Sequence, residues 1–170
     1  WDMTALRMRL SASGFAVRRF VYPSLRSPPT DNATALHGYV AELDADTVHF
    51  VAHSLGGLVV RYLFAMHPTQ PQGRIVTLGT PHVGSSAAEW ITSHGLAAIL
   101  GKSVEFGLKG TLPEWNGVRE LGVIAGTLRL GLGWLIPGLE RPNDGTVTVA
   151  ETRMNGMTDH IVLPVSHFGM

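Results

Sequence analysis

The segment VAHSLGG, residues 51–57, restricts the fold of this chain more than any other. The apolar run Thr47–Ala52 is typical of a strand buried on both faces, and Leu55–Met66 has the residue spacing of a helix. Where a strand runs this abruptly into a helix, only small residues fit two positions before and two positions after the serine. Ala52 and Gly56 occupy those places. The segment therefore predicts a strand, a very tight turn at the serine and a helix.

Helix-like and strand-like segments alternate along the rest of the chain, without an internal repeat or a low-complexity linker. Apolar spacing predicts helices at Trp1–Ser13 and from Asp31 to about Leu43. Short runs of apolar and β-branched residues predict further strands at Phe15–Tyr22, Arg74–Leu78, Leu121–Ala125 and His160–Val165. Such alternation predicts the α/β class, with a mostly parallel sheet flanked by helices.

Size and composition narrow the class further. The 170 residues suit a single domain spanning 1–170, and a hydrophobic content of 45% is enough for a buried core. Because 13 basic residues balance 13 acidic ones without long runs of one sign, no nucleic-acid partner is expected. The absence of cysteine excludes disulfides, thiolate metal sites and a cysteine nucleophile. This composition is compatible with the cytoplasm and equally with an exported bacterial protein.

Neither a membrane span nor a cofactor is expected. The longest apolar stretch, Leu121–Leu139, is dense in glycine and contains Arg129, whereas a spanning helix needs about 20 mostly apolar residues. No signal-peptide pattern opens the chain. The histidines are scattered rather than set at metal-ligand spacing, and no glycine-rich phosphate loop follows a strand.

Ser54 is the candidate nucleophile, because the predicted turn would present its hydroxyl clear of the backbone. The Leu55 amide would lie at the N-terminus of the following helix, where the helix dipole favours negative charge. Leu55 is therefore the candidate oxyanion-hole donor for a carbonyl that Ser54 attacks. The alternative is an ordinary strand-to-helix turn in which Ser54 caps the helix.

A nucleophilic serine needs a base and an acid that orients the base, and with this kind of turn they follow in the order acid, then histidine. The turn at residues 142–147 offers Asp144, although an Asn-Asp-Gly sequence is also a general turn former. His167 follows the last predicted strand and is the candidate base. The weaker alternatives are Asp159 and Glu140 for the acid and His160 for the base.

Candidates for the substrate pocket are His53, His82 and Trp90. His53 adjoins Ser54, but neighbouring side chains diverge in a turn, so we expect it to shape the pocket. Residues 86–116 are apolar enough for a lid or an acyl-binding wall, and ordinary core packing is the alternative. The apolar residues concerned are Trp90, Ile91, Leu96, Ile99, Leu100 and Phe106.

Two blocks, AHSLGG at 52–57 and LGTPHVGS at 78–85, resemble the lipase/esterase branch of the α/β-hydrolase superfamily. They are similar to bacterial triacylglycerol lipases and to the GPI inositol-deacylase-like group, and NDGTV at 143–147 and SHF at 166–168 resemble that group's acid and histidine blocks. The resemblance covers most of the chain in order. It implies an α/β-hydrolase fold and hydrolysis of an ester or lipid substrate through an acyl-enzyme.

The chain departs from these relatives in three places. Ala52 stands where glycine is commoner, which is a mild variation. In the relatives, a strand that ends in a loop with the second oxyanion donor precedes the helix that Trp1–Ser13 resembles. This sequence has no room for that strand before the helix. They also continue beyond the position of Met170 with another helix. The resemblance thus implies truncation at both ends, weak activity of the chain alone and self-association through an exposed sheet edge.

Two further hypotheses remain open at this point. An acyltransferase would use the same fold and the same serine, with an alcohol in place of water. A catalytically silent fragment or binding module would keep the fold without the reaction.

Overall fold

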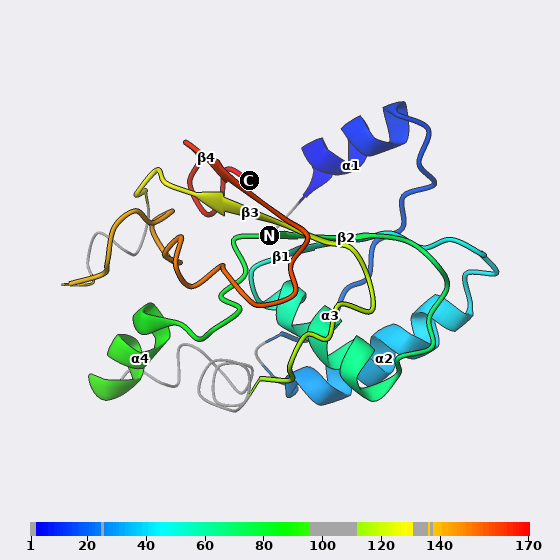
Figure 1. Cartoon of the computed structure of the whole chain (residues 1–170), viewed down its shortest axis with the longest axis horizontal. Helices are drawn as coiled ribbons and strands as arrows, with labels where there is room; N and C mark the ends of the chain where they lie inside the picture. Colours follow the sequence, from blue (N-terminus) through cyan, green and yellow to red (C-terminus); the bar gives the residue numbers. More distant parts are fainter. Residues whose placement is uncertain (1–2, 25, 96–111, 131–135, 137) are drawn as a thin grey trace.

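The computed structural model describes residues 3–24, 26–95, 112–130, 136 and 138–170 (Figure 1). Its centre is one 4-stranded sheet with the order β1-β2-β3-β4, in which every neighbouring pair is parallel. The strands are β1 (Phe50–His53), β2 (Ile75–Leu78), β3 (Leu121–Gly126) and β4 (Asp159–Leu163). Because the strands are parallel, their carboxyl ends meet at one edge, and the loops that follow them converge there.

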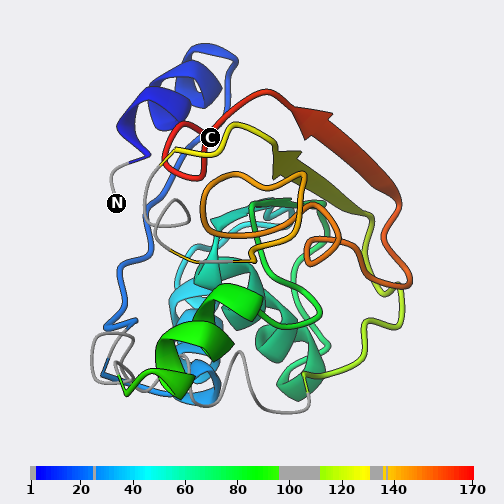
Figure 2. The same ribbon diagram turned by 90° about the vertical axis from the view of Figure 1, so that its left-hand side faces the viewer.

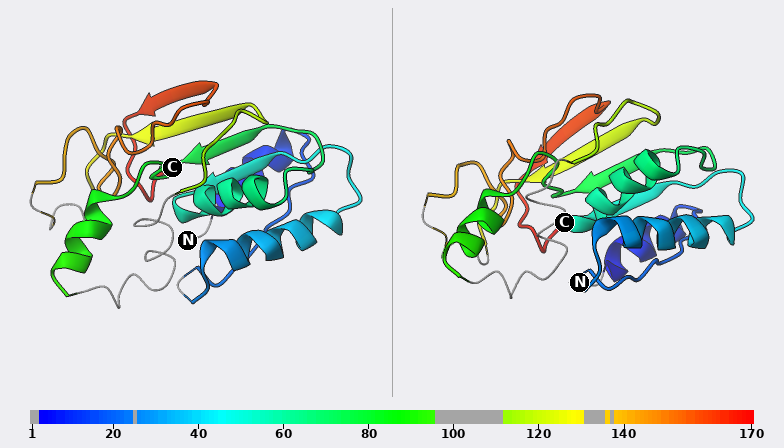
Figure 3. Two further views of the ribbon diagram at one scale, coloured as in Figure 1. Left: turned by 60° about the horizontal axis from the view of Figure 1, so that its bottom comes forward. Right: turned by 90° about the horizontal axis from the view of Figure 1, so that it is seen from below.

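The helices are α1 (Thr4–Ala12), α2 (Pro29–Ala41), α3 (Leu55–Met66) and α4 (Ser86–Ser93). Figure 3 shows α2 and α3 side by side on one face of the sheet, and Figure 2 shows α1 on the other side. No residue of α1 is buried. The predicted parallel α/β fold is therefore confirmed, with α2 and α3 covering one face of the sheet.

The main core lies between the sheet and the α2–α3 layer. Leu63 of α3 is fully buried, and Phe64 meets Phe50 of β1 and Trp115 edge to face, with ring centroids 5.7 Å apart in both pairs. Burial of each such large side chain contributes about 1.5–3 kcal/mol. The helix that follows Ser54 is thus anchored along most of its length, which holds its N-terminus in place.

The prediction of a strand at Phe15–Tyr22 is wrong. These residues are not in a β-ladder, and the amide of Val17 instead bonds to the Phe15 carbonyl at 3.0 Å. A β-branched and aromatic run becomes a strand only where a neighbouring strand pairs with it. Here the rings of Phe20 and Tyr22 pack on the core instead, and the ring centroids of Phe20 and Tyr39 of α2 lie 5.4 Å apart.

Several predicted boundaries also shift. Thr47 forms an isolated bridge with Gln72, and the strand itself begins at Phe50. α2 begins at Pro29, two residues before the expected start, because proline fits the first turn of a helix. In the described part of the chain, none of the helices is both long and apolar enough for a membrane span.

Candidate active site

The turn between β1 and α3 holds Ser54 in a strained conformation. Its φ of 52° and ψ of −125° are rare for a residue with a side chain, and such strain is typical of functional turns. Its amide donates to the Leu78 carbonyl at 2.9 Å, and its carbonyl accepts from the Thr80 hydroxyl at 2.9 Å. The β2 strand and the loop after it therefore hold both backbone polar groups of Ser54.

Gly57 makes the contact with Thr80 possible. A Cβ at Gly57 would lie 2.2 Å from the Thr80 hydroxyl oxygen, so any side chain there would force Thr80 to shift. Thr80 is fully buried and was not among the residues singled out from the sequence. The close approach of α3 to the loop after β2 therefore needs this second glycine after the serine.

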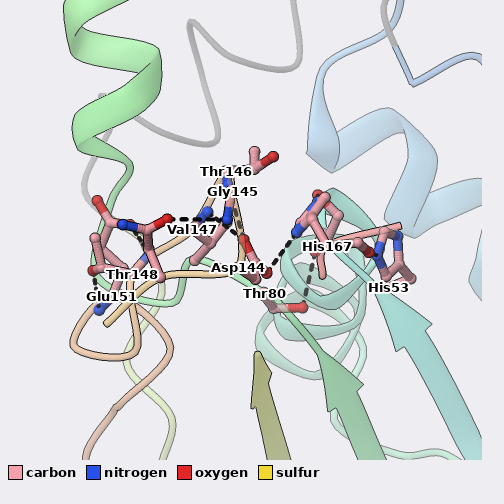
Figure 4. A network of polar contacts seen from close by, with 11 residues as sticks. His53, Thr80, Asp144, Gly145, Thr146, Val147, Thr148, Glu151 and His167 are labelled. Atoms are coloured by element: carbon pink, nitrogen blue, oxygen red, sulfur yellow. Dashed lines mark hydrogen bonds and ion pairs between the residues drawn. The ribbon is translucent and has the colours of Figure 1, made fainter. Parts of the chain in front are cut away.

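The structure brings Ser54, His167 and Asp144 together from three separate loops at the carboxyl edge of the sheet. The Nε2 atom of His167 lies 3.1 Å from the Ser54 hydroxyl oxygen. Its Nδ1 lies 2.8 Å from Oδ2 of Asp144, and Figure 4 shows this second contact. His167 is 3% exposed and Asp144 is 0% exposed. The carboxylate–imidazole pair is therefore shielded from water, which strengthens their interaction.

The acid loop orients Asp144 with its own backbone. Oδ1 accepts from the amides of Thr146 at 2.9 Å and Val147 at 2.7 Å, which leaves Oδ2 for His167. A carboxylate accepts and does not donate, so the proton between them lies on Nδ1 of His167. Nε2 is then the acceptor that faces the Ser54 hydroxyl, which is the tautomer a general base needs.

Two glycines at strand ends make room for this pair. A Cβ at Gly79, after β2, would lie 3.0 Å from both Oδ2 of Asp144 and Nδ1 of His167. A Cβ at Gly126, the last residue of β3, would lie 2.8 Å from the Cβ of Asp144. Residues without side chains at both positions let the acid and the histidine lie directly over the ends of the strands.

Leu55 is the first residue of α3, so its amide lies at the positive end of the helix dipole and directly follows Ser54. The position is the one predicted for an oxyanion-hole donor.

The three predicted pocket residues lie in different surroundings. His53 contacts His167, with Nε2 at 2.7 Å from the His167 carbonyl oxygen. His82 is 2% exposed and lies in the interior, where Nε2 is 3.0 Å from the Thr77 hydroxyl. Burial, with a further effect of Arg61, lowers the pKa of His82 to about 3. His82 therefore does not line an open pocket.

Trp90 lies on α4, half-buried, and stacks on His94 with ring centroids 4.1 Å apart. It packs against the cluster of Ala87, Ile136 and Leu139. The predicted lid candidates Leu96, Ile99, Leu100 and Phe106 lie outside the described residues.

The alternative acid and base candidates lie away from Ser54. Asp159 begins β4, at the opposite edge of the sheet from the serine, and accepts from the His160 amide at 2.8 Å. The His160 ring lies 3.0 Å from the Thr152 hydroxyl. Glu140 is exposed. Within the described ranges, no three metal-ligating side chains gather at one place.

Glu151 is a second residue that the sequence reasoning missed. Its buried carboxylate accepts from the amide and hydroxyl of Ser86, both at 2.6 Å, and from the Thr148 amide at 2.7 Å. It thereby joins the acid loop to the start of α4, as Figure 4 shows for its bond to Thr148. The Thr-x-x-Glu pattern at 148–151 is the signal that could have revealed it, because that spacing is typical of a capping box.

Part of the sequence is similar to that of known bacterial lipases. No family model matches the chain. A triacylglycerol lipase of Pseudarthrobacter phenanthrenivorans is 37% identical over 67 residues, which are 37% of this chain and 21% of the relative. A triacylglycerol lipase of Burkholderia plantarii is 37% identical over 67 residues, 37% of this chain and 18% of that protein. The matched part is thus about a fifth of these relatives.

Three solved structures are similar over most of the chain. The mature form of the Bacillus licheniformis lipase BlEst2 gives a TM-score of 0.71 at 22% identity and covers 88% of this chain and 70% of that one. Phospholipase PlaB from Legionella pneumophila gives a TM-score of 0.70 at 17% identity, and the match covers 95% of this chain and 47% of that one. The metagenomic carboxyl esterase MGS0156 gives a TM-score of 0.62 at 20% identity, and the match covers 84% of this chain and 52% of that one.

Proposed function

Because the chain has the α/β-hydrolase fold of the lipases and esterases that it resembles, we propose that it hydrolyses carboxylic esters with Ser54 as the nucleophile. One observation carries the proposal: a single imidazole, that of His167, lies 3.1 Å from the Ser54 hydroxyl and 2.8 Å from the Asp144 carboxylate. A serine that only caps a helix would not need this arrangement. In addition, Ser54 makes no side-chain cap to α3.

In the proposed reaction, the Ser54 oxygen attacks the ester carbonyl carbon while His167 Nε2 accepts the hydroxyl proton. The carbonyl oxygen becomes an oxyanion, which the Leu55 amide stabilises at the N-terminus of α3. Asp144 stabilises the imidazolium that forms. His167 then gives the proton to the leaving alcohol as the carbon–oxygen bond breaks, which leaves Ser54 acylated.

Water completes the cycle in the second half of the reaction. His167 takes a proton from the water, whose oxygen attacks the acyl carbon, and returns it to Ser54 as the acid departs. An alcohol in place of water would transfer the acyl group instead. Product analysis with a competing alcohol separates these two outcomes.

The experiment is labelling by a fluorophosphonate probe, together with hydrolysis of p-nitrophenyl esters of increasing chain length. Ser54→Ala should abolish labelling and lower turnover by about 10⁴-fold or more, because a triad without its nucleophile loses most of its rate. Ser13→Ala, at the exposed C-terminal end of α1, is the matched control and should label as the wild type does. Equal labelling of the wild type and Ser54→Ala would refute the proposal.

A further inference from the structure

The His53 imidazole contacts the main chain of His167, although 114 residues separate the two in sequence. Its Nε2 lies 2.7 Å from the His167 carbonyl oxygen, and the ring centroids are 4.7 Å apart. Figure 4 shows His53 on the side of His167 away from Asp144. The ring thus supports His167 from the side that the acid loop does not reach.

With this contact, each polar group of His167 has a partner. Its amide donates to the Asp144 carbonyl at 2.8 Å, and its ring nitrogens face Asp144 and Ser54. Its carbonyl accepts from His53. Loss of the last bond would leave the His167 main chain tied through the acid loop alone, and the imidazole could then move relative to Ser54.

The chemistry of the contact sets the state of His53. A carbonyl oxygen only accepts, so Nε2 of His53 carries the proton and donates it. Burial, and secondarily the proximity of His167, lowers the pKa of His53 to about 4. His53 therefore stays neutral at neutral pH, and it adds no positive charge beside an imidazolium that forms on His167.

We propose that His53 is a positioning residue, which fixes the main chain of His167 and so holds its imidazole between Ser54 and Asp144. The role differs from the pocket-shaping role expected from the sequence, because the donor nitrogen of His53 is directed at protein backbone. The inference rests on the proposed ester hydrolysis, in which His167 must stay within reach of the Ser54 hydroxyl.

Two substitutions test the bond itself. His53→Phe keeps a ring and removes the donor, whereas His53→Gln keeps an N–H donor that can reach the same carbonyl. His53→Phe should lower kcat by about 10- to 100-fold, the range that small misplacements of a catalytic group cost. KM should stay within about twofold, because substrate binding is not the interaction that was lost. His53→Gln should recover most of the lost kcat.

The matched control is His37→Phe, which replaces another half-buried imidazole, on α2, where the ring stacks on His67. It should leave kcat within about twofold of the wild type, because the ring has no contact with the catalytic groups. Circular dichroism and thermal melting establish that each variant is folded.

A readout independent of turnover separates this proposal from the proposed function. The proton on His167 Nδ1, bonded to a buried carboxylate, should give a downfield NMR signal, and its loss in Asp144→Asn should identify it. The signal should broaden or disappear in His53→Phe and persist in His53→Gln. An unchanged signal and kcat in folded His53→Phe, or a loss confined to KM, would overturn the positioning role. If the wild type hydrolyses no ester but the NMR pattern holds, the proposed function fails and the positioning of His167 stands.

Discussion

Asp144 uses its two carboxylate oxygens for different tasks. Oδ1 accepts two amides of its own loop, while Oδ2 faces the imidazole of His167. The loop therefore fixes the carboxylate, and its direction does not depend on the histidine. Fixed dipoles and charges of this kind lower a reaction barrier because they need no reorganisation during the reaction.

Asp144→Asn tests this division of tasks. The amide oxygen can keep the two loop bonds, so the amide nitrogen would face Nδ1 of His167 and donate to it. The proton of His167 would then lie on Nε2, where it cannot accept from Ser54. We expect kcat for a p-nitrophenyl ester to fall by about 10³- to 10⁴-fold with little change in KM. Asp159→Asn, at the start of β4, is the control and should leave kcat unchanged; a drop of equal size there would count against Asp144.

His82 makes stability depend on pH. Its folded-state pKa of about 3, lowered mainly by burial, lies below the usual 6.5 of an unfolded histidine. His82 therefore binds a proton in the unfolded chain at pH values where it stays neutral in the folded chain. Its contribution to stability is fully present above about pH 6.5 and is lost as the pH falls toward 3. His82 alone should cost about 2 kcal/mol between pH 7 and pH 5.

Urea unfolding of the wild type and His82→Gln at both pH values measures this contribution. The variant should lose about 2 kcal/mol less than the wild type on acidification, because glutamine does not titrate. His49→Gln, which replaces an exposed imidazole, is the control. It should lose as much free energy of unfolding between pH 7 and pH 5 as the wild type does. Identical pH dependence of His82→Gln and wild type would show that the buried ring is not the source.

At the scale of elements, α3 meets the loop after β2 at Gly57. A methyl group there would overlap the Thr80 side chain, whose hydroxyl supports the strained Ser54 carbonyl. The distance between α3 and the loop after β2 is therefore limited by a residue three positions after the serine. In contrast, Gly38 on α2 has open space where a Cβ would lie.

The two glycines should respond to alanine with opposite signs. Gly57→Ala should destabilise the fold by about 1–3 kcal/mol through overpacking, and it should slow fluorophosphonate labelling as Thr80 moves. Gly38→Ala should stabilise by about 0.5–1 kcal/mol, because alanine favours the helix and meets no neighbour. Chemical denaturation measures both. Destabilisation of similar size at both positions would contradict the close approach of α3.

Elements also show where local prediction is limited. The helix after Ser54 and the strands at 75–78 and 121–126 form as their local sequence patterns predict, because their apolar residues are buried in the core. The run at 15–22 has a similar composition and is not a strand. A strand needs a partner, and its own residues do not specify one.

At the scale of the molecule, β1 and β4 lie at the two ends of the sheet in the part of the chain that the structure describes. Three consecutive apolar residues of β4, Ile161, Val162 and Leu163, are 46%, 42% and 39% exposed. An apolar strand at the end of a sheet can pair with another copy, whereas a lysine there opposes pairing. We therefore expect these 170 residues to self-associate through this end of the sheet.

Sedimentation velocity over a dilution series tests the expectation. The wild type should sediment faster with rising concentration, and Ile161→Lys should shift it toward the monomer. Val118→Lys introduces the same charge at a residue 43% exposed outside the strands and is the control. A wild type that stays monomeric throughout the series, or an equal effect of both lysines, would exclude association through β4.

The sequence by itself determined the strand–turn–helix at Ser54, the parallel α/β class and the resemblance to α/β-hydrolase lipases, and all three are confirmed. These depend on local spacing and on small residues that a tight turn requires. It also indicated Ser54, Asp144 and His167 as an ordered set, whose catalytic roles stay predictions.

Only the tertiary structure decided which side chains meet. The contacts of His53 with His167, of Thr80 with Ser54 and of Glu151 with Ser86 join segments far apart in the chain. The interior position of His82 was likewise hidden from sequence reasoning. The physical reason is common to all of them: hydrogen bonding and burial depend on distance in space, and local sequence patterns report only on neighbours along the chain.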